Sequence, residues 1–533
     1  MASLGRASAL IGAGTLVSRV TGLVRNIVLV GALGVVPSAA FDAFGVANQL
    51  PNSIFALISS GLLAGVIVPQ IVKAVRTHDD RGSAFVSKLL TLGVVTLAAV
   101  TAVAMVAAPL LVLIYGGRFS ADGRALALAL AYWCLPQLFF YGLYALVGEV
   151  LNARRIFGPY AWSPIINNVV SIAGFGAFIW LFGLRRSASG WTPEMIALLG
   201  GTATLGIVLQ ALVLLLFWRR AGLTVRADFR WRGIGLGHIG RLAGWTFLMV
   251  VVGQVAGAVQ ANLVGSASGL GAANGAMQTA WLLFMLPFSV IVISLGTPYY
   301  TQLSEHVAEG RTDAVTADLS TLTRTIGVFM VGVLGAMVAA IVPLSAIFAD
   351  HPDEAVALAW VLGAFLVALL PLSFQFGIQR TFYALGDTRT PFLYTVVQAV
   401  LVVITAIVGF LVLPAPWLAV GIALGQSLAN IVQFALAVAL LRRKLGPLGL
   451  GDAVRSIVRF LVAVVPATGA GWLAFEMLGG TDGWPTSDRW AGFLAAALIG
   501  VLTLVVYVVL LALLRAPELR TAAQAVRRFL PGR

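Results

Sequence analysis

The sequence is short of charge: only 10% of its 533 residues are Asp, Glu, Lys or Arg, whereas 60% are hydrophobic. A soluble domain carries roughly 25% charged residues. Because no soluble fold has enough interior to hide this much apolar surface, the composition excludes a water-soluble enzyme. The apolar stretches recur along the whole chain, which also excludes a single membrane anchor on a soluble body.

Cysteine is scarce as well, since the sequence holds one, Cys134. A disulfide within the chain and a cysteine metal cluster are therefore excluded. The sequence also lacks a phosphate-binding loop, a zinc-protease motif and a Ser/His/Asp pattern. We expect no catalytic residue, no metal site and no cofactor, and no ATPase within this chain. Sodium, protons and the membrane potential all stay open as the driving force.

What the sequence has is a series of apolar stretches, each long enough for the roughly 20 residues that cross a bilayer as a helix. They are rich in Gly, Ala, Leu and Val without strict alternation, which favours helices over a β-barrel. We expect an all-α polytopic membrane protein with about 14 transmembrane helices. The expected limits are 8–35, 42–72, 87–114, 125–152, 161–184, 196–218, 242–264, 275–302, 324–349, 356–383, 391–413, 416–441, 459–478 and 490–514.

The net charge of +14 follows the expected topology. If the N-terminus is cytoplasmic, cytoplasmic segments hold 27 of the 34 Lys and Arg residues, outer loops hold five, and two lie in the first span. This is the positive-inside bias of a multi-pass protein in the bacterial cytoplasmic membrane, with both termini inside. The positive charge therefore predicts contact with anionic membrane lipids rather than nucleic acid. Arg185 and Arg186, which fall outside, are the main exception.

An internal repeat relates the two halves of the chain. Leu50-Pro51 and Leu286-Pro287 are 236 residues apart, and Leu135-Pro136 and Leu370-Pro371 are 235 apart. The alternative is that such pairs recur by chance in apolar sequence. Because the offset covers six spans, an even number, the repeat predicts two six-helix lobes of the same orientation. We expect lobes at residues 1–235 and 236–445, followed by two further helices and a basic cytoplasmic tail at 446–533.

Two prolines lie within helical patterns at matching places in the repeat. Pro51 is followed by a Ser/Gly stretch that includes Gly61, and Pro287 by one that includes Gly296. Proline removes a backbone hydrogen bond and bends a helix. Paired bends suggest a gate formed by these four residues, while a static kink is the alternative.

The first span contains Arg19 and Arg25 near its middle. A central arginine costs about 2.5–3.5 kcal/mol on insertion scales, so both must face a protein interior, a cavity or an anion. Asp42, at the start of the second span, could neutralise one arginine but not both. The sequence therefore favours an anion-binding site over a structural ion pair. Gly22, between the arginines, permits a bend or a close helix approach.

Five segments carry a resemblance to a known family: SRVTGLVR at 18–25, FDAFGVANQLPN at 41–52, LNARRIFGPYAWSP at 151–164, WLLFMLPFSVIVISLGTPYYTQLS at 281–304 and FYALGDTRTP at 382–391. They resemble the MurJ/MviN family of the multidrug/oligosaccharidyl-lipid/polysaccharide exporter superfamily, over roughly residues 1 to 515. The resemblance implies a flippase that moves lipid II, the undecaprenyl-diphosphate-linked peptidoglycan precursor, from the inner to the outer leaflet by alternating access.

The same resemblance implies the substrate site. The family's cavity arginines match Arg19 and Arg25, and its acid at the start of the second helix matches Asp42. With Ser18 and Gly22 from the first motif, these residues are the expected substrate-binding set. The substrate, and with it the peptidoglycan pathway, makes cell-wall synthesis proteins candidate partners.

Several positions depart from the family pattern. Arginines that some members carry are replaced here by Phe55, Ala56 and Leu282, and a glutamate is replaced by Ser60. The seventh span has no carboxylate, which puts a family-type sodium site in doubt. The cavity is thus expected to be less basic than in other members, and the exact headgroup stays open.

Two other functions compete with a lipid II flippase. A cation-coupled exporter of drugs, or of another polyprenyl-linked oligosaccharide, would belong to the same superfamily. A drug exporter would favour buried acids facing a cationic substrate, whereas the first helix offers Arg19 and Arg25. A scaffold of the cell-wall machinery is the third class, and two charges in one span argue against it.

Overall fold

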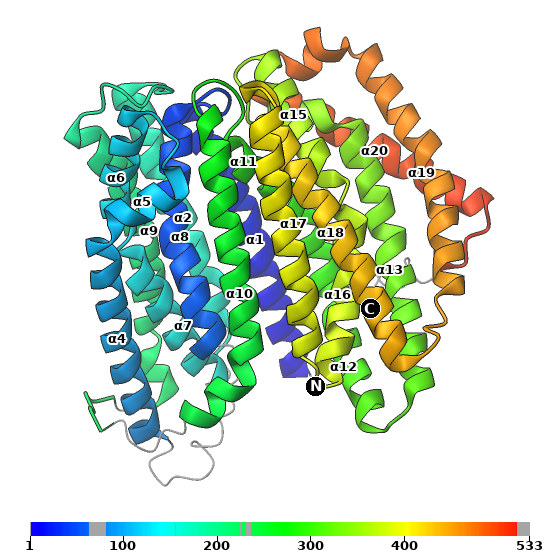
Figure 1. Ribbon diagram of the computed structural model, residues 1–533, viewed down its shortest axis with the longest axis horizontal. Coiled ribbons are helices and arrows are strands. Elements are labelled where there is room, and N and C mark those ends of the chain that lie inside the picture. The colour runs from blue at the N-terminus through cyan, green and yellow to red at the C-terminus, as the bar shows by residue number, and fades with distance from the viewer. Residues whose placement is uncertain (1, 63–81, 155, 224, 231–235, 520–533) are drawn as a thin grey trace. The chain divides into compact units, whose positions relative to one another are not determined.

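The structure is a computed structural model that describes residues 2–62, 82–154, 156–223, 225–230 and 236–519. Within these residues it is built from helices (Figure 1), which confirms the all-α prediction. Of the described helices, 13 are long and apolar enough to cross a membrane. The second expected span, 42–72, begins as α2 (Ala39–Leu62), and its residues 63–72 lie outside the described part. The count therefore agrees closely with the expected 14.

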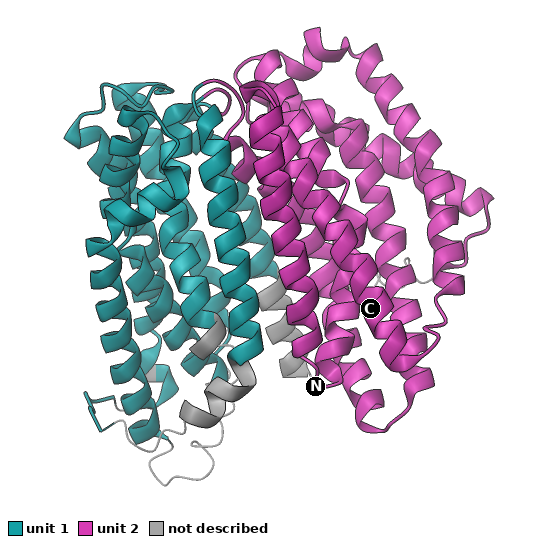
Figure 2. Cartoon of the chain, in the orientation of Figure 1, with its two compact units in different colours: residues 1–34, 38–269 teal, residues 35–37, 270–533 magenta. Residues whose placement is uncertain are grey.

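The chain divides into two compact units, residues 1–34 with 38–269 and residues 35–37 with 270–533 (Figure 2). The first unit contains α1 (Ala2–Leu33), α2, α4 (Ser83–Val106), α5 (Ala108–Gly116), α6 (Ala121–Cys134), α7 (Gln137–Ala153), α8 (Gly158–Phe182), α9 (Pro193–Leu215) and α10 (Leu236–Val264). Two short 3-10 helices, η1 (Trp218–Ala221) and η2 (Gly265–Ala267), follow α9 and α10. Helix α10 packs on α2 and α5 and so belongs to this unit, whereas its span number placed it in the second lobe. The predicted division at residues 235 and 445 stays a prediction.

The second unit contains the remaining helices. They are α11 (Asn274–Pro287), a π-helical turn at Phe288–Val292, α12 (Ile293–Ala308), α13 (Thr312–Ala339), α14 (Ile341–Ala346), α15 (Pro352–Leu366), α16 (Leu369–Ala384), α17 (Arg389–Val412), α18 (Ala415–Leu445), α19 (Gly451–Met477) and α20 (Arg489–Leu513). Two 3-10 turns, Gly480–Asp482 and Trp484–Thr486, join α19 to α20.

The same helix pairing recurs in both units, as an internal repeat predicts. In the first unit α2 packs on α6, α4 on α7, α6 on α9 and α8 on α9. In the second unit α11 packs on α15, α13 on α16, α15 on α18 and α17 on α18. Leu135-Pro136 and Leu370-Pro371, the second pair of the repeat, each mark the start of a helix. Pro136 is the N-cap of α7, and Pro371 lies in the first turn of α16.

Besides the spans that break near the second Leu-Pro pair, between α6 and α7 and between α15 and α16, two more expected spans are broken rather than continuous. The span predicted at 87–114 is interrupted at Ala107 between α4 and α5, and the span predicted at 324–349 is interrupted at Ala340 between α13 and α14. A proline follows each break, Pro109 and Pro343, and proline cannot donate the backbone hydrogen bond that would continue the helix. The equivalent breaks are a further sign of the repeat.

The two additional helices at the C-terminal end cover α13. Both α19 and α20 pack on α13 and on each other. The hydroxyl of Tyr507 donates to the carbonyl of Val328 over 3.0 Å, and Ser456 Oγ donates to Glu518 Oε1 over 2.5 Å. These buried contacts satisfy polar groups that lipid could not. The basic tail, residues 520–533, lies outside the described part.

Candidate functional site

Helix α1, which carries the two arginines, packs along α8 in the first unit. The amide of Asn168 on α8 donates from Nδ2 to the carbonyl of Ser18 and to Thr21 Oγ1, both over 2.9 Å. Gly22 faces the same amide, since a Cβ there would lie 3.6 Å from Nδ2. Small residues that let membrane helices approach closely are typical of such contacts. Helix packing therefore accounts for Ser18 and Gly22, and their role in substrate binding stays a prediction.

Arg19 and Arg25 are both half-buried in α1. Among the residues that the structure describes, neither forms an ion pair with an acidic side chain. Arg25 lies within electrostatic range of the hydroxyl of Tyr141 on α7. Six residues at about 100° each turn the two side chains about 120° apart around the helix. The unit thus holds two guanidinium groups in its membrane region whose charge no described carboxylate neutralises.

Asp42 has a different partner from the one expected. It is 2% exposed in the first turn of α2, and it accepts a hydrogen bond of 2.7 Å from Ser268 Oγ, just after η2. In the described part of the chain it pairs with neither arginine. The reason is distance along the helix axis. Arg25 precedes the end of α1 at Leu33 by eight residues, which is about 12 Å at 1.5 Å per residue.

A chain of polar side chains extends from Arg25 through the first unit. The hydroxyl of Tyr141 donates to Gln137 Oε1 over 3.3 Å. The amide of Gln137 in turn donates from Nε2 to Thr204 Oγ1 on α9 over 3.0 Å, with a longer contact of 3.4 Å to Asn48 Oδ1 on α2. Sequence reasoning missed these residues. The available signal in the sequence was a polar residue, Gln137, directly after Leu135-Pro136 in an otherwise apolar stretch.

Phe55 occupies a position where some family members carry an arginine. Its ring stacks on Tyr141, with ring centres 6.0 Å apart and planes at 29°. An aromatic pair of this geometry adds roughly 0.5–1.5 kcal/mol beyond area burial. The hydroxyl end of Tyr141 lies near Arg25 while its ring packs on Phe55, so position 55 contributes packing rather than charge. Ala56 and, in the second unit, Leu282 are half-buried and also uncharged.

The four expected gating residues differ in their surroundings. Pro51 is buried inside α2, which continues through it. Gly61 falls in the last turn of α2, and its role as a gating residue stays a prediction. Pro287 ends α11 and is followed by the π-helical turn, a feature often found at functional bends. Gly296 on α12 packs against the ring of Phe376 on α16, so a methyl group there would have no room.

Most of the chain matches one known protein family. The model of the family described as "Lipid II flippase MurJ" matches residues 30–482. The chain belongs to this family. The family is one of flippases, which move lipids and are not enzymes, and the resemblance drawn from the sequence is confirmed.

Curated relatives of the same description match at low identity. A probable lipid II flippase MurJ of Synechocystis is 23% identical over 97% of this chain and 96% of its own length. A probable lipid II flippase MurJ of Haemophilus influenzae is 29% identical over 45% of this chain, and one of Rhizobium tropici is 28% identical over 56%. These two alignments span 47% and 55% of the relatives' own lengths, about half of each.

Solved structures agree on the fold. Lipid II flippase MurJ in an inward closed conformation matches with a TM-score of 0.71 and 20% identity, over 93% of this chain and 97% of that one. An inward-facing multidrug resistance transporter of the MATE family in the MOP superfamily matches with a TM-score of 0.61 and 17% identity, over 81% and 95%. At such identities the likeness concerns the fold alone, and together with the 13 candidate spans it makes the chain a multi-pass membrane protein.

Proposed function

We propose that this protein flips lipid II, the lipid-linked peptidoglycan precursor, from the inner to the outer leaflet. The observation that carries the proposal is the pair Arg19 and Arg25, which no described carboxylate neutralises in the membrane region of the first unit. Membership in the family described as lipid II flippase supports it. Guanidinium groups bind phosphate oxygens with two parallel hydrogen bonds, and a diphosphate offers several such oxygens.

Energetics favour an anionic ligand at these arginines. Each mid-span arginine costs about 2.5–3.5 kcal/mol on insertion scales. Since Asp42 pairs with neither arginine in the described part of the chain, the compensation has to come from elsewhere. A diphosphate headgroup supplies two or more negative charges, and a site of low dielectric strengthens the attraction relative to water. The prenyl tail of the substrate can meanwhile stay in lipid.

Movement of the headgroup would proceed by alternating access of the two repeated halves around this site. Pro51 and Gly61 in the first half, and Pro287 and Gly296 in the second, are the proposed gating residues. The π-helical turn after Pro287 supports a bend at that point. Sodium, protons or the membrane potential would supply the driving force.

A polyprenyl-linked oligosaccharide other than lipid II is the second candidate substrate. Phe55, Ala56 and Leu282 replace arginines of other family members, so the site carries fewer charges than theirs. A cationic drug fits less well. Its exporter needs a buried carboxylate facing the cavity, whereas α1 offers Arg19 and Arg25.

We further propose the bacterial cytoplasmic membrane as the location, with both termini in the cytoplasm. The split of 27 inner against five outer basic residues supports this orientation. The exposed Arg442 and Arg443 at the end of α18 would then meet anionic lipid headgroups of the inner leaflet. Proteins of cell-wall synthesis are the expected partners.

The test is complementation in a strain whose own flippase is depleted. We expect depletion to accumulate lipid II on the inner leaflet, and this chain to restore growth and clear the accumulated lipid. Growth without clearance of lipid II would contradict the proposed flipping of lipid II and indicate another function. Clearance of a different polyprenyl-linked glycan, with lipid II unchanged, would favour the second substrate. Altered drug resistance alone would favour a multidrug exporter.

A further inference from the structure

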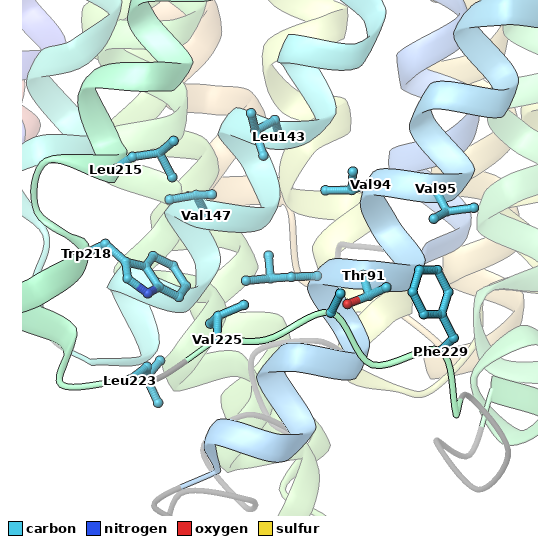
Figure 3. Close-up of a pocket in the computed structure, with 12 residues that line it drawn as sticks. Thr91, Val94, Val95, Leu143, Val147, Leu215, Trp218, Leu223, Val225 and Phe229 are labelled. Carbon is cyan, nitrogen blue, oxygen red and sulfur yellow. The ribbon is translucent and has the colours of Figure 1, made fainter.

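A groove of about 710 Å³ opens at one end of the first unit (Figure 3). Its walls come from α4, α7, the end of α9 and η1, and it is closed on one side by the chain segment at residues 225–230. Pockets of roughly 300–1,000 Å³ hold small organic ligands. Apart from Thr91, the lining side chains are apolar, with Leu143, Val147 and Trp218 among them. The groove therefore suits an apolar ligand.

The segment at 225–230 is held to α4 by side chains that accept from its backbone. The N–H of Arg226 donates to Ser87 Oγ over 3.2 Å, and the N–H of Asp228 donates to Thr91 Oγ1 over 3.1 Å. Every second residue, Val225, Ala227 and Phe229, lines the groove. This spacing of two is that of an extended chain, so the charged residues between them face away from the groove.

Basic side chains surround the mouth of this apolar groove. Arg226 and Arg230 are exposed on the segment. Arg230 Nε forms an ion pair with Asp228 Oδ1 over 3.2 Å. Lys88 on α4 lies within electrostatic range of the same carboxylate. Arg220 lies over the ring of Phe217, 5.2 Å from its centre. On and beside the segment 225–230, three bases, Arg226, Arg230 and Lys88, outnumber the one acid, Asp228, among the described residues.

We propose that this groove binds an anionic phospholipid of the bilayer, with an acyl chain in the groove and the phosphate on Arg226 and its basic neighbours. The apolar side chains at the mouth are exposed, since Val225 is 39% and Phe229 64% accessible. Such exposure is unfavourable in water and favourable against an acyl chain. Basic residues next to an apolar surface match a lipid that has both an anionic head and a hydrocarbon tail.

The faces of α7 separate this groove from the arginine site. Tyr141, near Arg25, is followed on α7 by Leu143 and Val147, which line the groove. At about 100° per residue, these two lie about 200° and 240° around the helix from Tyr141. A prenyl chain whose diphosphate binds Arg25 would leave on the other side of α7. The occupant is therefore a bilayer lipid and not the tail of the transported substrate.

The test uses the full-length protein in nanodiscs made of phosphatidylcholine with a trace of phosphatidylglycerol that carries a diazirine in one acyl chain. After illumination, labelled peptides are mapped by mass spectrometry. We expect the label in α4, α7 and residues 225–230. Arg226→Gln removes the free guanidinium, and Ala227→Trp fills the groove. Each should lower labelling of these peptides roughly tenfold, as expected for one charge-assisted hydrogen bond or a blocked pocket.

Arg443→Gln is the matched control, because Arg443 is an exposed arginine at the end of α18 and outside the groove. It should leave the labelling of α4, α7 and residues 225–230 unchanged. Label spread evenly over the apolar surface, or unaffected by Arg226→Gln, would overturn the proposal. So would a diazirine polyprenyl diphosphate that labels the groove more strongly than phosphatidylglycerol. If Ala227→Trp fails to fold, Arg226→Gln alone decides, because it keeps the backbone contact to Ser87. Lipid labelling is independent of transport, so the proposed function can fail without affecting this result.

Discussion

Asp42 accepts a hydrogen bond of 2.7 Å from the hydroxyl of Ser268, which joins the first turn of α2 to the residue after η2. On the same side, the amide of Asn262 near the end of α10 donates to the carbonyls of Leu113 and Ile114, both over 3.0 Å. Two separate contacts thus hold the end of α10 to α2 and α5. Asp42 therefore helps to position the end of α10, and in the described part of the chain it pairs with neither Arg19 nor Arg25.

Ser268→Ala should therefore lower the free energy of unfolding by about 1.5–3 kcal/mol, the usual effect of a hydrogen bond to a charged group. Asp42→Asn should be milder because its amide oxygen still accepts. The measurement is thermal unfolding of the purified protein in detergent. Ser266→Ala is the control, since Ser266 bonds only a nearby backbone carbonyl among the contacts described.

A double-mutant cycle separates the two roles of Asp42. We expect Asp42 to couple to Ser268 and to be independent of Arg25. Strong coupling between Asp42 and Arg25, with Ser268→Ala no worse than Ser266→Ala, would restore the ion-pair interpretation.

Gly296 supports a second prediction, because it is held by packing against Phe376. Gly296→Ala should destabilise the second unit by about 1–3 kcal/mol, the usual cost of overpacking. Shortening the partner in the double variant Gly296→Ala/Phe376→Leu should recover much of this loss. Gly500→Ala on α20 is the control, since a Cβ there meets nothing within 4 Å. Equal effects of Gly296→Ala and Gly500→Ala would contradict the role of Gly296 in close packing.

Asp387 between α16 and α17 leads to a pH-dependent prediction. Partial burial alone would raise its pKa, but hydrogen bonds from Lys444, over 2.6 Å, and from Thr390 outweigh burial and hold the pKa below its ordinary value. Because the pKa of Asp387 is lower in the folded protein than in the unfolded chain, its ionised carboxylate stabilises the fold. This stabilisation is fully present above the pKa of the unfolded chain, about 3.9, and is lost as the pH falls through the pKa of the folded protein.

Lys444→Ala should consequently lower the melting temperature at pH 7, and the difference from the unchanged protein should shrink below about pH 4. Melting temperatures between pH 7 and pH 3 measure this. Arg443→Ala, one residue away and exposed, should show no such convergence. A difference that stays constant over the whole range would assign the effect of Lys444 to packing.

The sequence predicted the fold well because hydrophobic length and proline position are local signals. The spans and the repeat follow from them, since Pro136 and Pro371 mark equivalent half-helix starts. The breaks at Ala107 and Ala340 were missed because an apolar run stays apolar across a helix break. Arg19 and Arg25 were found because charge in a span is costly. Tyr141 and Gln137 were missed because only the packing of α2, α7 and α9 brings them near Arg25.

The proposed orientation predicts opposite sides for two positions that flank α10. Asp228 lies in the segment before α10, and Ser268 lies just after it. Reporter fusions at residue 228 should read as cytoplasmic, and fusions at residue 268 as external. The opposite readings at both sites would reverse the orientation and with it the proposed direction of transport.

The two arginines of α1 give the prediction on which the proposed function depends most. With no described acidic partner, removal of either guanidinium relieves an insertion cost of about 2.5–3.5 kcal/mol and breaks no ion pair. Arg19→Ala and Arg25→Ala should therefore insert at normal abundance and yet fail to support growth of a flippase-depleted strain. Lysine at either position should rescue partly, because it keeps the charge and loses the two-pronged contact with phosphate.

A structural role would give a different pattern from a binding role. If the arginines held α1 in place, their removal would lower protein abundance on an immunoblot together with growth. Val24→Ala, on the exposed side of the same helix, controls for disturbance of α1 and should support full growth. Because the proposed site needs both charges for a diphosphate, the double variant Arg19→Ala/Arg25→Ala should be inactive at normal abundance. Full growth with that double variant would falsify the anion site.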